Sequence, residues 1–125
     1  MNLKQLTAQF CHLRVNEKCT SSPGYEEWVI YAEDLGKWNR ILSDLLGPAV
    51  KPKGEKTTQE AFALTVKFGG ILEDQILYHK KICGVSVVAM LWPWKNNVHV
   101  TIKMASFKSG KGAGNPDASM QSEAM

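Results

Sequence analysis

Apolar residues recur at three- and four-residue spacing near the start of the chain, which predicts a short helix. The pattern begins after Asn2, a residue that can cap a helix, and extends over about 3–13. Its apolar positions are Leu3, Leu6, Phe10 and Leu13. The polar stretch 15–22 that follows is typical of a loop.

A second and longer helical pattern begins at Ser21-Ser22-Pro23. A serine oxygen can accept from the free amides of a first turn, and proline needs no amide donor there. We therefore predict a long helix over about 23–46, ended by Gly47-Pro48. One broad apolar face carries Trp28, Tyr31, Ala32, Leu35, Trp38, Leu42 and Leu45.

Two patterns compete within residues 58–68. Thr57-Thr58-Gln59-Glu60 has the spacing of a capping box, and Gly69-Gly70 would end a helix. Against this, Phe62, Leu64, Val66 and Phe68 alternate as in a strand. The capping signals favour a helix over about 58–68, and a strand over 61–68 stays open.

The pattern becomes β from residue 75, with three strands predicted over about 75–82, 85–92 and 98–105. These segments are rich in β-branched and aromatic residues, and Cys83-Gly84 and Asn96-Asn97 suit two-residue hairpin turns with positive φ. A three-stranded antiparallel meander follows.

The predicted fold class is α+β: two or three helices pack on one face of this meander, which gains a fourth strand if 61–68 is extended. Residues 1–108 form a single domain, because two domains of this length would each bury little apolar surface. The stretch 109–125 has almost nothing to bury, and we expect a disordered tail.

The two turns fix which side chains meet across the strands. The first turn pairs Ile82 with Val85, Lys80 with Val87, Tyr78 with Ala89 and Ile76 with Leu91; the second pairs Leu91 with Ile102 and Ala89 with Met104. This largely apolar face is assigned to the core beneath the helices. A slip of one residue in either hairpin would destroy the partition.

The opposite face mixes large apolar groups with cations and two imidazoles. Eight of its residues form the predicted binding surface: His79, Lys81, Met90, Trp92, Trp94, His99, Thr101 and Lys103. A sheet face in water would rarely carry so many apolar groups. We expect a cover over it, which could be the N-terminal helix, a second copy of the chain in a homodimer, or a ligand.

Charge is unevenly distributed along the chain. The 125 residues have a net charge of +3, with 44% hydrophobic and 22% charged residues. The stretch 75–116 has six lysines and no acidic residue, so an acidic protein or an anionic ligand is the expected partner. No segment has the roughly 20 apolar residues needed to cross a bilayer and no secretion signal is visible, so we expect a cytoplasmic protein without a membrane partner.

The sequence contains no specific catalytic, metal or cofactor motif. Cys11, Cys19 and Cys83 are odd in number and read as reduced thiols. We expect no metal and no cofactor, because adjacent residues such as Cys11 and His12 diverge on a helix. A contact between His79 and Ser86 is conceivable, but an acidic partner for this histidine would have to come from another element.

The function that these patterns favour is a small, non-enzymatic binding or regulatory module that uses this sheet face. One alternative is a small enzyme or enzyme subunit with a site between the sheet and the long helix, with catalytic residues unknown. Convergence of His79 and His99 near Glu33 or Asp34 would favour that alternative. A further alternative is binding of single-stranded nucleic acid, because rings on a sheet can stack bases.

Overall fold

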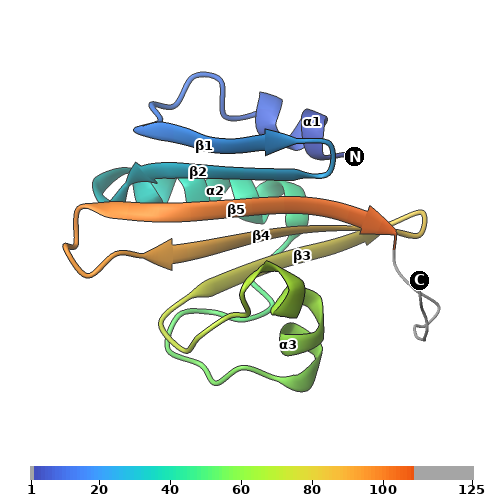
Figure 1. The fold of residues 1–125 in the computed structure, drawn as a ribbon. Coiled ribbons are helices and arrows are strands. Elements are labelled where there is room, and N and C mark those ends of the chain that lie inside the picture. The colour runs from blue at the N-terminus through green and yellow to red at the C-terminus, as the bar shows by residue number, and fades with distance from the viewer. Residues whose placement is uncertain (1, 109–125) are drawn as a thin grey trace.

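The computed structural model describes residues 2–108, so the tail predicted at 109–125 lies outside the described residues. Five strands and three helices alternate with two short 3-10 turns (Figure 1). In chain order these are α1 (Leu3–Ala8), β1 (Glu17–Ser22), β2 (Tyr25–Tyr31), η1 (Ala32–Asp34), α2 (Leu35–Leu46), α3 (Gln59–Thr65), η2 (Val66–Phe68), β3 (Ile76–Ile82), β4 (Val85–Pro93) and β5 (His99–Lys108).

The strands form one antiparallel sheet in the order β1-β2-β5-β4-β3. The predicted meander is therefore confirmed as β3-β4-β5, and the hairpin β1-β2 extends it beyond β5. All six cross-strand pairs predicted from the two turns are present: Ile82 with Val85, Lys80 with Val87, Tyr78 with Ala89, Ile76 with Leu91, Leu91 with Ile102, and Ala89 with Met104.

The two turns differ in how closely they follow the prediction. Cys83 and Gly84 both have positive φ (51° and 79°), as a two-residue hairpin turn of this type requires. At the second turn only Asn97 has positive φ, and four residues separate the paired residues Trp94 and His99. The centre of this longer loop is the predicted one, so the register is unchanged.

The predicted long helix over 23–46 is wrong in its first half. Residues Tyr25–Tyr31 form β2, and the helix α2 begins only at Leu35, after the turn η1. Pro23-Gly24 makes the tight turn between β1 and β2, and Gly24 takes a φ of 83° that proline-glycine turns favour. The predicted end at Gly47 is confirmed.

The predicted loop over 15–22 is also corrected, because Glu17–Ser22 forms the edge strand β1. All six of its residues are exposed, so no buried face leaves a hydrophobic pattern in the sequence. The sheet consequently has five strands, where three or four were expected.

Helices cover both faces of the sheet, and the prediction that they share one face is wrong. The helix face, defined here as the one that α1 and α2 cover, contains the larger hydrophobic cluster, whose sheet residues include Ala89, Leu91 and Met104. The second face carries Leu77, Val88 and Met90 under α3 and η2. In Figure 1, α2 lies behind β2 and β5, and α3 lies below β3 in the view.

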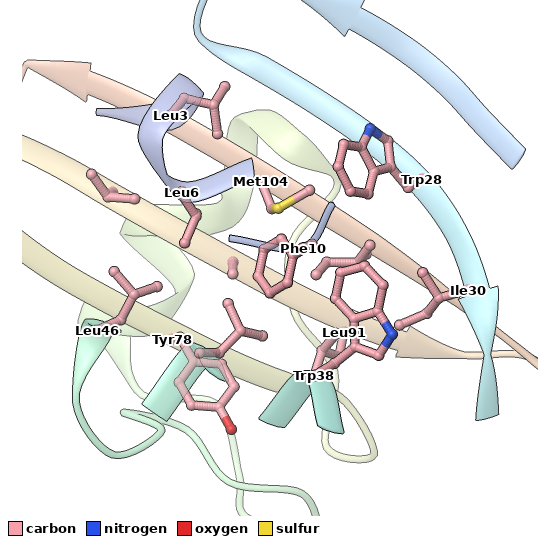
Figure 2. Close-up of a cluster of buried hydrophobic side chains, with 14 of the residues drawn as sticks. Leu3, Leu6, Phe10, Trp28, Ile30, Trp38, Leu46, Tyr78, Leu91 and Met104 are labelled. Carbon is pink, nitrogen blue, oxygen red and sulfur yellow. The ribbon is translucent and has the colours of Figure 1, made fainter. Parts of the chain in front are cut away.

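Three aromatic rings from three segments meet at the centre of the helix face (Figure 2). Phe10 lies 4.5 Å from Trp38 and 6.4 Å from Trp28, measured between ring centroids. The N-terminal segment therefore packs on the core instead of covering the second face. Its helix is shorter than the predicted 3–13, although Asn2 caps it in a capping box with Gln5 as the sequence indicates.

The open choice over 61–68 is resolved as helix. Thr58 caps α3 by accepting a hydrogen bond from the Ala61 amide at 3.1 Å, and Gly69 ends η2 with a φ of 104°. The apolar side chains turned toward the sheet include Ala61, Leu64 and Phe68, while Phe62 and Val66 point into solvent.

Candidate functional site

The structure places all eight predicted site residues on the second face, as the register requires. It does not bring them together into one surface. Met90, Trp92, Lys103 and His79 lie at or beneath the cover formed by α3 and η2, whereas Trp94, His99 and Thr101 lie at an uncovered corner. Lys81 is exposed near the turn between β3 and β4.

The residues beneath η2 are occupied in holding that cover in place. Met90 is fully buried in the second-face cluster. The Lys103 ammonium donates to the Phe68 carbonyl at 2.9 Å and lies 3.4 Å from the centre of the Trp92 ring. Burial lowers the pKa of Lys103, and the Glu27 carboxylate opposes that shift. A Cβ at Gly69 would approach Trp92 to 2.8 Å, which makes glycine necessary at this contact.

His79 forms the contact with Ser86 that the strand register predicts. Its Nε2 lies 3.0 Å from the Ser86 Oγ, and the serine is buried. Burial lowers the pKa of His79; the nearby charge of Lys81 adds to this shift, and Glu60 on α3 opposes it. The neutral imidazole is therefore favoured beneath the cover.

Aromatic rings gather at the uncovered corner of the second face, where β2 ends and β5 begins. The ring of His99 lies 5.0 Å from Trp94 and 5.7 Å from Tyr31. The Trp94 Nε1 donates to the Thr101 Oγ1 at 2.8 Å, and this bond fixes the indole although its side chain is 41% exposed. We call Tyr31, Trp94, His99 and Thr101 the corner strip.

Pro93 explains where this corner lies. The Trp94 amide donates to His99 in β5, so the nitrogen of the preceding residue points toward the β3 side. Pairing with β3 has already ended there, at Ile76 opposite Leu91. Proline therefore costs the sheet no hydrogen bond, and pairing with β5 continues past it.

Charged groups border the corner strip on two sides. The Arg14 guanidinium lies 4.2 Å from the centre of the Tyr31 ring and pairs with the carboxylates of Glu33 and Asp34. Lys95, the residue after Trp94, is exposed. Glu33 and Asp34 are thus paired with an arginine, while two further carboxylates, Glu17 and Glu27, lie on the same sheet face opposite Val29 and Lys103.

Sequence reasoning missed Tyr31 and Arg14 as members of this region. The sequence pattern predicts a helix at Tyr31. In the strand β2, alternate residues share a face, so Tyr31 lies on the same side of the sheet as Val29. Arg14 falls between the helix predicted at about 3–13 and the loop predicted at 15–22, and no sequence signal links it to Tyr31. The pairing of β1, which follows shortly after Arg14 in the chain, with β2 brings the two together.

Lys51 is a further residue that the sequence does not reveal. Its side chain is 1% exposed, and the ammonium donates to the carbonyls of Pro52, Glu73 and Gln75 at 3.1, 2.8 and 2.6 Å. Its backbone also bridges Leu77 at the edge of β3. Burial lowers the pKa of Lys51, and the neighbouring carboxylates oppose that shift. Lys51 therefore fastens the segment leading to α3 onto the sheet.

The geometry gives little support to the alternative prediction, an enzyme with its site between the sheet and the long helix. His79 and His99 do not converge, because six residues of β5 separate their positions, about 20 Å along the strands. The space between the sheet and α2 is filled by the hydrophobic cluster of the helix face. Within residues 2–108 no three His, Cys, Asp or Glu side chains gather as metal ligands, and no helix there is long and apolar enough to span a bilayer.

The chain matches no protein-family model, no curated protein and no solved structure. Any function has to be argued from the geometry of the described residues.

Proposed function

We propose that this protein is a non-enzymatic binding module whose corner strip engages an acidic segment of a partner protein or a similar anionic ligand. The observation that carries the proposal is Trp94, a large aromatic side chain that is both exposed and fixed in orientation. Rigid, exposed tryptophans are frequent anchors of binding energy, because little entropy is lost when a partner covers them.

The surroundings of the strip favour an acidic partner. Lys95, the exposed residue after Trp94, can pair with an incoming carboxylate. Glu33 and Asp34 on this side pair with Arg14, which offsets one of their two negative charges. The lysines of the segment 75–116 that the structure describes, up to residue 108, do not form one patch, however: Lys80 approaches the Leu45 carbonyl on the helix side, and Lys103 donates to the Phe68 carbonyl. The predicted surface is accordingly reduced to the corner.

The structure gives less support to the other two functions. The Ser86 hydroxyl beside His79 is buried under α3, where a substrate would not reach it. For nucleic acid, stacking would have to use Trp94, His99 and Tyr31 with only Lys95 and the already paired Arg14 nearby. An acidic peptide needs fewer cations than a phosphate backbone.

Fluorescence anisotropy with two labelled peptides tests the proposal, one rich in glutamate and leucine and one rich in lysine and leucine. We expect the glutamate peptide to bind more tightly, with an affinity that falls as salt is added. Trp94→Ala should weaken it about tenfold, equivalent to about 1.4 kcal/mol, without changing the thermal midpoint.

Phe62→Ala is the matched control, because Phe62 is also an exposed aromatic residue (56%) but lies on the outer side of α3. Its affinity for the peptide should equal that of the unchanged protein. Absence of glutamate-peptide binding, equal binding of the lysine peptide, or equal losses in the two variants would each contradict the proposal.

A further inference from the structure

A groove on the helix side of the molecule, separated from the corner strip by the ion pair of Arg14 with Glu33, has features of a small-molecule site. It is an open groove with a volume of about 670 Å³, within the range of ligand pockets. His12 and Leu13 form one wall, and the first turns of α2 form the other with Gly36, Lys37, Arg40 and Ile41.

The charges in this groove are predominantly positive. Lys37 and Arg40 are three residues apart on α2 and therefore neighbours on its surface, and His12 lies across from them. Glu33 also lines the groove, but its carboxylate is paired with Arg14. Lys37 is 3.9 Å from Asp34, and Arg40 forms no ion pair with any residue between 2 and 108.

Gly36 supplies an independent observation. Its φ is not positive, so its backbone conformation does not require glycine. A Cβ built at this position would meet no atom within 4 Å, so packing does not require glycine either. Glycine weakens a helix relative to alanine, and here its effect is to keep the groove free of a side chain.

We propose that this groove binds a small anionic ligand, a carboxylate or phosphate carried on a compact apolar body. Lys37, Arg40 and His12 would face the anionic group, and the apolar body would lie against Leu13 and Ile41, which are both partly buried. Such a mixed lining, with an apolar floor and a few convergent polar groups, is typical of ligand sites. This site goes beyond the proposed function, because it uses residues outside the corner strip and takes a small molecule with an apolar body instead of a protein segment.

Amide NMR titration with phenyl phosphate, benzoate and uncharged phenol tests the proposal. We expect saturable shifts at the amides of Gly36, Lys37 and Arg40 with one or both anions and none with phenol. Tighter binding of phenyl phosphate would identify a phosphate ligand, and tighter binding of benzoate a carboxylate.

Two variants and a control complete the test. Lys37→Gln combined with Arg40→Gln should weaken binding at least about tenfold, whereas Lys53→Gln combined with Lys56→Gln, which removes the same charge from an exposed loop, should leave it unchanged. Gly36→Met should fill the groove and reduce binding while the protein stays folded. The proposal is wrong if neither anion gives saturable shifts, if the two double variants behave alike, or if Gly36→Met binds as well as the original chain.

Discussion

The two faces of the sheet differ in how they are covered. On the helix face, α1 and α2 bury fifteen residues in one cluster, including Phe10, Trp28 and Trp38. On the second face, the cover is the seven-residue helix α3 with η2, and only six residues are buried beneath it. Because hydrophobic stabilisation scales with the apolar area removed from water, the helix face contributes most of the stability.

The second-face cover is held by a few specific contacts instead of a broad core. Phe68 stacks on Tyr25 with centroids 5.6 Å apart and contacts Phe107 at 6.0 Å, and Lys103 donates to its carbonyl. The cover also stops short of the corner strip. Because the second face supplies less of the stability, it can leave the aromatic side chains of the corner strip exposed, where the proposed partner would contact them.

The largest expected effect tests the unequal contribution of the two faces. Trp38→Ala should lower the free energy of unfolding by about 3–5 kcal/mol, because Trp38 is fully buried. Phe68→Ala should cost less than half as much, because Phe68 is partly exposed and loses mainly two ring contacts. Urea denaturation measures both.

Equal losses in the two variants would contradict the comparison. Hydrogen exchange gives a second readout, since Phe68→Ala should speed exchange in α3 and leave α2 protected. Faster exchange throughout the chain would show that the second face is as central to stability as the helix face.

The next effect concerns the link between the faces. Lys51→Met should destabilise the protein by about 2 kcal/mol, because three carbonyl oxygens lose a charged donor even though the cost of burying the ammonium is removed. Lys53→Met, an exposed neighbour, should stay within about 0.5 kcal/mol. A loss as small for Lys51 as for Lys53 would mean that the three hydrogen bonds do not hold the segment.

The sequence predicts the meander well, because local turn chemistry sets its register. Cys83-Gly84 and the centre at Asn96-Asn97 fix the pairing, and both faces then follow from strict alternation. The second loop is longer than expected, but it gains one residue on each side of Asn96-Asn97, so the cross-strand pairs stay the same.

The hairpin β1-β2 was missed for two physical reasons. Tyr25–Tyr31 carries apolar groups on both faces, so Trp28, Tyr31 and Leu35 also fit a helical period. The polar edge strand β1 has no buried face, and its existence depends on β2. The turn at Pro23-Gly24 was the available signal, because glycine after proline is typical of a tight turn.

Part of the candidate site depends on contacts that no local pattern contains. The sequence places Trp94, His99 and Thr101 side by side, since they belong to one hairpin. Which second-face residues are covered depends instead on where α3 packs. The roles of Lys103 beneath η2 and Lys51 at the sheet edge arise from that packing. A count of charges along the sequence does not distinguish these two lysines from exposed ones.

The smallest expected effect separates the covered part of the second face from its open corner by pH. Burial lowers the pKa of His79 below its usual 6.5, so the unfolded chain takes up the proton first as pH falls. Stability should therefore decrease as pH falls from about 6.5 toward the lower folded-state pKa, and His79→Gln should reduce this decrease. Urea midpoints at several pH values measure the slope of stability against pH. An unchanged slope in His79→Gln would contradict the prediction. It would mean that α3 shields the imidazole, and with it the second face, less than the contacts of α3 indicate.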